Sequence, residues 1–476
     1  MINKIIKYEF RLLKSDFSLV VAIFSFIIFL SFFNSYYKVN TFNETYNQIA
    51  LEEKESTDKS QKEAKEIEAQ MIKDGESLKE NRRGVRNPSN LGNKGTNISL
   101  KTNDFSHLAI GLYDLYPVIY TVNNLSKNSS AKNIENPLSL YIGNFDPCFV
   151  ILYLYPIFII ILSFDLIAGE KEKGLLKILL TQSISLNTLI WGKILVRALI
   201  IFSTVILSFL ISLIVSGVNI FAPDNLSRTF LLIAVIIIYG SFWFSLAIFV
   251  NSLKTKAVTN AMTLSIIWLV FLLIIPSLIN LSANYIYPIP SRIHYVEAIT
   301  EASEEARLKG SKILGQFMED HPELSGKNID TSKVSVVQAM RDEEILKKTK
   351  PINDVFNNQI NNQKDFIDKL QFLSPAIITQ EIIYDISGSG IDRLQGYSNQ
   401  LNEFQKDWRK FFVTKIFNTK PLYASDYNNL PQFNYIEETN ADILKRSLFP
   451  IIFLFIISLI IYFSSRKRYK KYSMTE

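Results

Sequence analysis

The sequence has few of the residues that usually carry catalysis or cross-links. Its 476 residues include one cysteine, Cys148, and three histidines, so an internal disulfide and an all-cysteine metal site are excluded. His107, His294 and His321 lack the His-x-x-x-His or Glu-x-x-His spacing of a zinc protease or a di-iron centre. No Gly-x-Ser-x-Gly nucleophile elbow occurs. We therefore expect no catalytic residue and no metal site in this chain.

The segment Gly169–Gly174 has the glycine spacing of a phosphate-binding P-loop but not its other residues. Leu175 and Leu176 stand where that loop requires Lys and then Ser or Thr, and without the Lys no side chain reaches the terminal phosphates of a nucleotide. The net charge of +6 is small for the length, so nucleic acid is not an expected partner. Any use of ATP must come from another polypeptide.

Long apolar runs dominate what the sequence does contain. Each run is about 20 residues long, which matches the hydrocarbon thickness of a bilayer, whereas a soluble protein spreads apolar residues at helix or strand periods. We expect a mainly α, polytopic membrane protein with six transmembrane helices at 17–37, 148–168, 195–216, 229–250, 259–281 and 447–465. The first run is too long for a signal peptide and no small-x-small cleavage site follows it, so it reads as an uncleaved anchor.

Lys and Arg near the span ends predict the orientation of the chain. With six spans, the Lys-rich segments all fall on one side, which should be cytoplasmic and contain both termini: 1–16, 169–194, 251–258 and the basic tail 466–476. The loop 217–228 on the other side carries only Arg228. Asp165 and Arg197 lie near cytoplasmic span ends, and no Asp, Glu or Lys lies mid-span. Ion-coupled carriers usually need such groups, and no inverted repeat is detected, so a secondary transporter is disfavoured.

Two large extracytoplasmic segments, 38–147 and 282–446, hold over half of the residues and are expected to be mostly helical and to pack together. Good helix formers between about 44 and 83 predict a long helix that rises out of the first span. It could be a solvated helix packed on its neighbouring domain or a coiled-coil arm; Gly75 interrupts its apolar stripe and favours the former. In the second segment, 293–319, 332–348, 353–372 and 404–417 read as helical.

The cytoplasmic loop 169–194 contains the most informative pattern. Residues 170–182 predict a short amphipathic helix beside the membrane, with Glu170 and Glu172 at its N-terminus, where the helix dipole favours acids. Ser183 or Ser185 should begin the turn into the next span, with Asn187 as a further N-cap candidate. Taken alone, this is an interfacial helix that links two spans.

This loop resembles that of the ABC-2 class of ATP-binding-cassette transporter permeases, which read acid-x-acid-x-Gly-Thr-Leu-x-x-Leu-Leu, then Pro-x-Ser-Arg and Gly-Lys. The residues that match in register are Glu170, Glu172, Gly174, Leu176, Leu179, Leu180, Ser185, Gly192 and Lys193; Leu175, Ser183 and Leu186 replace the Thr, Pro and Arg. The resemblance extends to the six spans and to a basic amphipathic segment, 2–16, that looks like the family's cytoplasmic interface helix. The external insertions are similar to those of one branch of the family.

The resemblance implies a permease subunit that couples ATP hydrolysis by two separate ABC ATPase subunits to substrate export or to force on the cell envelope. It implies that ATP and Mg are bound by the partner, that this chain holds no cofactor, and that a second permease chain, identical or paralogous, completes the transporter. Membrane lipid and an extracytoplasmic envelope protein are further expected partners, in the bacterial cytoplasmic (inner) membrane. The implied ATPase-docking residues are Glu170, Glu172, Gly174, Leu175, Leu176 and Leu179, flanked by Lys7, Arg11 and Lys14 of the interface helix.

Two further interpretations stay open. Tyr153, Tyr155, Trp243 and Trp268 could contact an amphipathic substrate along a path at the dimer interface, although a core or lipid-facing position is favoured for each. The chain could instead be a non-transport membrane scaffold or sensor that acts through its large extracytoplasmic domains. ATP hydrolysis by the purified complex would separate this alternative from a transporter.

Overall fold

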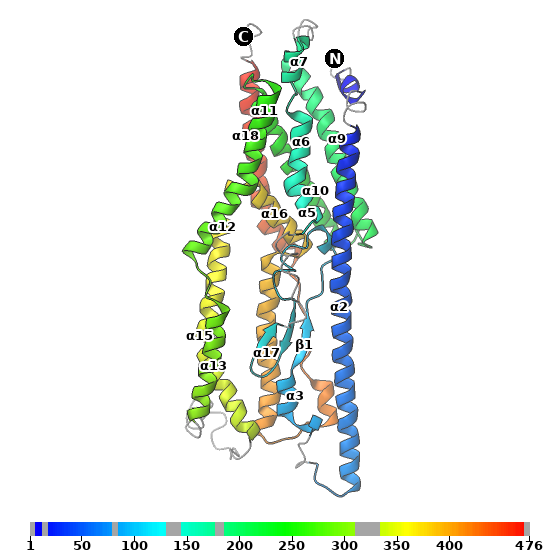
Figure 1. Ribbon diagram of the computed structural model, residues 1–476. Helices are drawn as coiled ribbons and strands as arrows, with labels where there is room; N and C mark the ends of the chain where they lie inside the picture. The colour runs from blue at the N-terminus through cyan, green and yellow to red at the C-terminus, as the bar shows by residue number, and fades with distance from the viewer. Residues whose placement is uncertain are drawn as a thin grey trace.

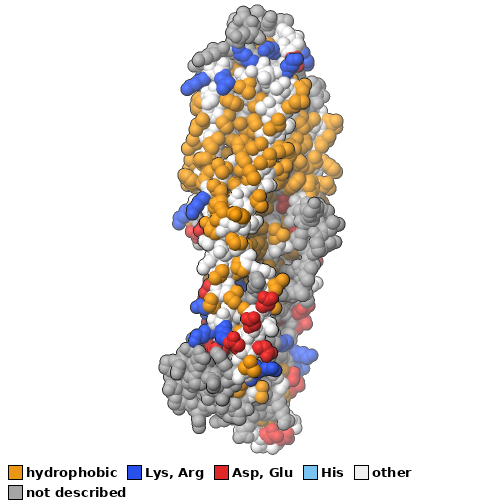
Figure 2. All heavy atoms as spheres, turned by 60° about the vertical axis from the view of Figure 1, so that its left-hand side comes forward, with side chains coloured by type: hydrophobic (Ala, Val, Ile, Leu, Met, Phe, Trp, Pro, Cys, Tyr) orange, Lys and Arg blue, Asp and Glu red, His pale blue; other side chains and the backbone are white. Residues whose placement is uncertain are grey.

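The computed structural model describes residues 5–11, 18–78, 84–129, 144–176, 185–309 and 334–470. The molecule is elongated, with a helical bundle at one end and a mixed body at the other, and both termini lie at the free end of the bundle (Figure 1). Hydrophobic side chains form a broad band across the face of the bundle that Figure 2 shows. The described residues contain six helices that are long and apolar enough to cross a membrane. The predicted mainly α, polytopic fold is confirmed.

The bundle is built from six candidate spans. The first is the membrane half of α2 (Ser18–Lys73). The second comprises α5 (Pro147–Phe149), η4 (Val150–Leu154), α6 (Tyr155–Ser163) and α7 (Ala168–Glu172). The third and fourth are α9 (Leu186–Val215) and α10 (Pro223–Asn251). The fifth comprises α11 (Ala257–Leu269), η5 (Val270–Ile274) and α12 (Ile275–Ile286), and the sixth is α18 (Asn440–Lys470). Because α10 packs against its neighbours on several sides, it is the most buried of the six.

The second and fifth spans share a π-helical turn followed by a proline. In η4 the N–H of Tyr155 donates to the carbonyl of Val150, five residues back, and Pro156 follows. Proline has no N–H, so the helix leaves a carbonyl free in this turn. The Tyr239 hydroxyl of α10 donates to the free Leu152 carbonyl at 2.9 Å. The π turn is therefore stabilised by a neighbouring span, as an unpaired carbonyl within a membrane requires.

The fifth span repeats this arrangement in η5. Pro276 is the second residue of α12, and the Ser374 hydroxyl donates to the Phe271 carbonyl at 2.6 Å. Ser374 is also the N-cap of α16 (Pro375–Ser387), where its side chain accepts the N–H of Ala376. This N-cap therefore attaches α16 directly to the fifth span.

The body combines both large inter-span segments, as expected. The first contributes the outer half of α2, η1 (Gly84–Arg86), α3 (Pro88–Lys94), η2 (Ser106–Leu108) and the antiparallel strands β1 (Thr96–Ser99), β2 (Ile119–Val122) and β3 (Lys127–Ser129). The second contributes α17 (Ile391–Phe417) and η8 (Ala424–Asn429). Their shared core includes Ala64 of α2, Val122 of β2 and Phe412 of α17. The burial of Ala64 supports a helix packed on its neighbouring domain; the small sheet was not expected.

A second column of helices continues from the fifth span, beside the body (Figure 1). It contains α13 (Arg292–Lys309) and α15 (Val334–Leu370), which is followed by η7 (Gln371–Leu373). The sequence predicted separate helices at 332–348 and 353–372, and this division is wrong, because α15 continues through Pro351. Pro351 is exposed, so water can satisfy the carbonyl whose helical hydrogen bond the proline removes.

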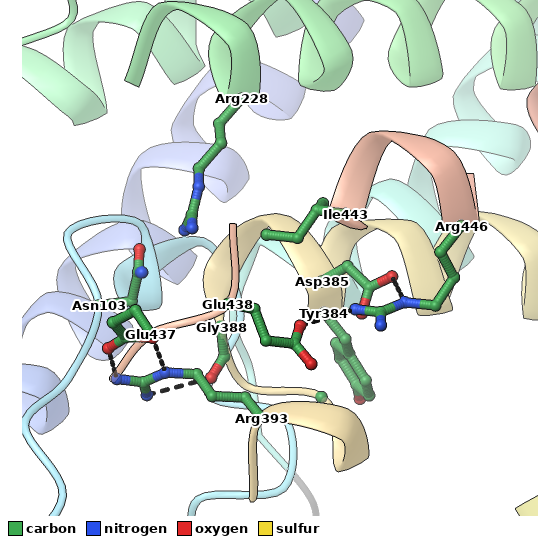
Figure 3. Close-up of a pocket in the computed structure, with 11 residues that line it drawn as sticks. Asn103, Arg228, Tyr384, Asp385, Gly388, Arg393, Glu437, Glu438, Ile443 and Arg446 are labelled. Atoms are coloured by element: carbon green, nitrogen blue, oxygen red, sulfur yellow. Dashed lines mark hydrogen bonds and ion pairs between the residues drawn. The ribbon is translucent and has the colours of Figure 1, made fainter. Parts of the chain in front are cut away.

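Charged side chains join the body to the bundle (Figure 3). Arg446 of α18 binds both oxygens of Asp385 in α16, with its Nε and Nη2 each 2.8 Å from an oxygen. Arg393 of α17 donates to both oxygens of Glu437, in the connection that leads to α18. Paired arginine–carboxylate bonds of this kind fix the orientation of both partners.

Candidate functional site around α7

The site lies at the end of the bundle that carries the termini, around α7 and the turn that precedes it (Figure 1). Residues Phe164–Ile167 form this turn between α6 and α7. Asn251, at the end of α10, donates to the carbonyl of Ser163 at 3.0 Å, and Asn260 of α11 donates to that of Phe164 at 3.2 Å. Both asparagines are buried. The turn is therefore held by the ends of the fourth and fifth spans.

Glu172 connects α7 to the fifth span. Its Oε1 accepts the backbone N–H of Ala257, the first residue of α11, at 2.8 Å. The first N–H groups of a helix lack partners within the helix, and an acid there also interacts favourably with the helix dipole. The sequence placed Glu172 at the N-terminus of its own helix; its carboxylate instead binds the N-terminus of another.

Glu170 connects α7 to the third span. Its Oε1 lies 2.6 Å from the Nζ of Lys193 in α9, and Lys193 also donates to the carbonyl of Leu166 at 3.0 Å. Lys193 is buried, so its charge depends on these partners. Glu170 and Glu172, which the sequence analysis singled out, thus bind α7 to the third and fifth spans.

The 5–11 helix is held by a buried ion pair. Its Glu9 lies against Arg197 of α9, with the Glu9 Oε1 2.7 Å from Nη2 and 2.8 Å from Nε. Arg197 also donates to the Leu162 carbonyl and lies 3.2 Å from the Asp165 Oδ1. Glu9 and Arg197 are 2% and 3% exposed. One guanidinium therefore joins the N-terminal helix, the third span and the turn before α7.

A close contact accompanies this pair. Ile5, one helical turn before Glu9, packs on Gly192 of α9, where a Cβ would lie 2.7 Å from the Ile5 Cγ2. Ile5 and Glu9 therefore share the face that meets the bundle. Lys7 and Arg11 are exposed on the rest of the helix, and the predicted Lys14 lies outside the described residues.

The chain after α7 turns toward the surface. Gly174 has φ +73°, a left-handed conformation that favours glycine, and no neighbouring atom would meet a Cβ there within 4 Å. Leu175 is 46% exposed, whereas Leu176 is 6% exposed and belongs to the bundle core. Leu179 lies outside the described residues. Of the docking residues predicted from the sequence, Gly174 and Leu175 therefore face outward, and Leu176 faces the chain's own core.

The predicted path residues lie elsewhere, within the bundle. Tyr155 and Trp243 are fully buried, and the Tyr155 hydroxyl donates to the Ile236 carbonyl at 3.3 Å. Trp268 of α11 donates to the Tyr153 carbonyl at 3.0 Å, across the second and fifth spans. These contacts describe packing between spans; contact with a substrate stays a prediction.

A family model confirms the resemblance seen in the loop. The model for ABC-2 family transporter proteins matches residues 4–390. The chain belongs to this family. Comparison with curated proteins and with solved structures gave no match. The chain is thus a multi-pass membrane protein and a permease component of an ABC transporter, a kind of subunit that is typically non-catalytic and that works with an ABC ATPase.

The sequence did not single out three residues of this site: Glu9, Asn251 and Asn260. Glu9 is the one acid between Lys4 and Lys14 in the N-terminal segment, and it lies four residues after Ile5, so the two share a helix face. Asn251 and Asn260 flank the short loop between the fourth and fifth spans. Amides at span ends are common, so their sequence carries no comparable signal.

Proposed function

We propose that this ABC-2 permease couples ATP hydrolysis by two separate ABC ATPase subunits to export of a substrate or to force on the cell envelope. The observation that carries the proposal is the connection of α7 to two spans at once, through Glu170 with Lys193 and Glu172 with Ala257. A partner that moves α7 therefore moves the third and fifth spans with it. In this view Gly174 and Leu175 form the exposed contact with the ATPase.

The 5–11 helix is the proposed second contact. Lys7 and Arg11 are exposed beside the same end of the bundle, and Glu9 joins the helix to Arg197. Arg197 also contacts Asp165 in the turn before α7. The Arg197 guanidinium therefore connects both proposed contact segments, and displacement of one should displace the other.

The proposed orientation places this end in the cytoplasm of a bacterium, with the body outside the inner membrane. Lys and Arg side chains gather at the end that carries the termini (Figure 2), as cytoplasmic span ends usually do. ATP and Mg would be bound by the ATPase subunits, and a second permease chain, identical or paralogous, would complete the transporter. The large body gives the complex a surface for an extracytoplasmic envelope protein.

The test is co-purification of the ATPase with two leucine variants. Leu175→Asp places a charge on a surface that is exposed in the isolated chain, so thermal stability should be unchanged while the ATPase and its ATP hydrolysis are lost. Leu176→Ala removes core packing, so it should destabilise the chain by about 2–5 kcal/mol while the folded fraction retains the ATPase. Retention of the ATPase by Leu175→Asp would contradict the docking assignment.

The same purification separates the alternative function. A scaffold or sensor that acts through the extracytoplasmic body needs no ATPase, so no ATP hydrolysis would accompany the unmodified chain purified from its native membrane. ATP hydrolysis that is lost in Leu175→Asp supports the transporter function. Complete absence of ATP hydrolysis from the purified, unmodified chain supports the scaffold function.

A further inference from the structure

A cavity of about 230 Å³ lies where the second span meets the body. Its walls come from the body, from the start of the second span and from α16, and include Asp114, Leu115, Phe149, Leu152 and Tyr384. The volume is smaller than the roughly 300–1,000 Å³ of sites for drug-sized ligands. It suits a small head group with part of a chain. The cavity lies at the opposite end of the bundle from the candidate functional site around α7.

Asp114 leaves an acceptor unused at this cavity. Its Oδ2 lies 3.1 Å from the Nζ of Lys38, which also donates to the Asn144 side chain at 2.8 Å. The Asp114 side chain is 4% exposed, and its Oδ1 has no hydrogen-bond partner among the described residues. A buried carboxylate oxygen without a donor is costly. A ligand that brings a donor would satisfy it.

The charge at the cavity favours a cation. Asp146 also lines it, and burial raises the pKa of Asp146 to about 6. Both of its oxygens already accept backbone N–H groups, from Phe149 at 2.8 Å and Ile110 at 3.0 Å. Lys38 balances Asp114, and none of the described lining residues is Lys or Arg. The described lining therefore contains two carboxyl groups and no cationic side chain, and one Asp114 oxygen is still without a donor.

The remaining lining combines polar residues, Asn144 and Gln380, with apolar side chains near the start of the second span. Leu152 belongs to the second span, and Phe149 lies in the first turn of that span. Leu115 and Phe149 are 61% and 36% exposed, so apolar side chains border the cavity on its accessible side. A ligand with an apolar chain could remain in contact with these residues and with the hydrocarbon of the bilayer.

We propose that this cavity binds an ammonium group carried on an alkyl chain, with the ammonium at the Asp114 Oδ1 and the chain over Leu152 and Phe149. The source is either the amino head group of a membrane lipid or a free amphipathic amine. The inference does not depend on ATP coupling, because binding can be measured on the purified chain without an ATPase.

Dodecylamine is the probe, and dodecanol is its uncharged control. Cys148 is the one cysteine of the chain and lines the cavity, but it is only 2% exposed. Its slow alkylation by a maleimide therefore requires local opening of the cavity wall, which a bound ligand should suppress. In a neutral maltoside detergent, dodecylamine should slow alkylation and raise the thermal midpoint, and dodecanol should do neither. Equal effects of the two compounds, or no effect of dodecylamine, would overturn the proposal.

Charge variants test the role of Asp114. Asp114→Asn should weaken dodecylamine binding by about 10- to 100-fold, the range expected for a lost charged hydrogen bond. Asp354→Asn removes the same charge from an exposed position on α15 and should leave binding unchanged. If Asp114→Asn does not fold, the exposed Leu115 supplies a second test: Leu115→Lys should weaken binding and Leu115→Glu should strengthen it. Equal affinity in all folded variants would refute an ammonium site.

Lipid nanodiscs distinguish the two sources. In discs of phosphatidylethanolamine, protection of Cys148 without added dodecylamine, absent in discs of phosphatidylglycerol, would identify a lipid head group. Protection that requires dodecylamine in both lipids would identify a free amine. Protection by phosphatidylglycerol alone would contradict a cation site.

Discussion

The buried pair of Glu9 and Arg197 allows a quantitative test of how the N-terminal helix is held. Glu9→Gln keeps the shape of the side chain but removes its charge, and leaves Arg197 with Asp165 and the Leu162 carbonyl. Loss of one partner of a buried ion pair typically costs about 3–5 kcal/mol. Because Asp165 remains 3.2 Å from Arg197, we expect a cost at the lower end of this range, about 3 kcal/mol. This cost corresponds to a roughly hundredfold increase in the equilibrium constant for detachment of the 5–11 helix.

Amide hydrogen exchange of the 5–11 helix measures this effect directly. If Glu9 fastens the helix to the bundle, Glu9→Gln should raise the exchange rate of its hydrogen-bonded amides by about two orders of magnitude, with little change in the centre of α10. Lys7→Gln is the matched control, because it also removes one charge from the same helix but at an exposed position. Exposed substitutions usually change stability by less than about 0.5 kcal/mol.

The outcome that would refute this reasoning is equal exchange in Glu9→Gln and Lys7→Gln. It would mean that packing of Ile5 on Gly192, rather than the ion pair, holds the helix. A second refuting outcome is a global rise in exchange throughout the bundle, because the effect would then be on the whole fold instead of on one local attachment.

Three further predictions address other parts of the molecule. Gly192→Ala should detach the 5–11 helix, because the new Cβ would lie 2.7 Å from the Ile5 Cγ2; hydrogen exchange reports the loss, and Ile5→Ala should partly restore protection. Tyr239→Phe removes the donor to the Leu152 carbonyl and should cost about 0.6–1.7 kcal/mol in detergent unfolding, with Tyr285→Phe at an exposed site as the control. Burial, followed by repulsion from neighbouring carboxylates, raises the pKa of Glu381 from 4.5 to about 8. The folded chain therefore binds the extra proton, stability should fall as the pH rises from about 4.5 to 8, and Glu381→Gln should reduce that slope.

The span pattern was predictable because it depends on one physical requirement. A bilayer needs about 20 apolar residues per helix, and each predicted run coincides with a helix that meets this requirement. The acids of the 169–194 loop were also identified. Their partners were not, because Glu172 binds the backbone N–H of Ala257, 85 residues away, and backbone donors carry no sequence signal.

The small sheet and the continuity of α15 show the limit of local patterns. β1, β2 and β3 are at most four residues long, too short for a clear alternation, and they form because Ile98 and Val122 are buried against α17 of the other segment. Proline normally ends or kinks a helix. Pro351 is tolerated because it is exposed, so water can satisfy the freed carbonyl. The preceding part of α15 packs against α13 and α17, a contact that the residues near Pro351 do not predict.

The junction determines how any movement of the spans affects the body. If α18 moved while α16 stayed in place, Asp385, whose side chain is 9% exposed, would lose Arg446 and remain buried without its cation. Such a separation typically costs several kcal/mol. Separating α16 from the fifth span would also break the hydrogen bond of Ser374 to the Phe271 carbonyl. Since the ends of α16 are tied to two spans, these costs favour movement of α16 and the attached α17 together with the spans. A displacement of α7 that moves the fifth span through the Glu172 contact with Ala257 would therefore reach the body through Ser374, about one membrane thickness away.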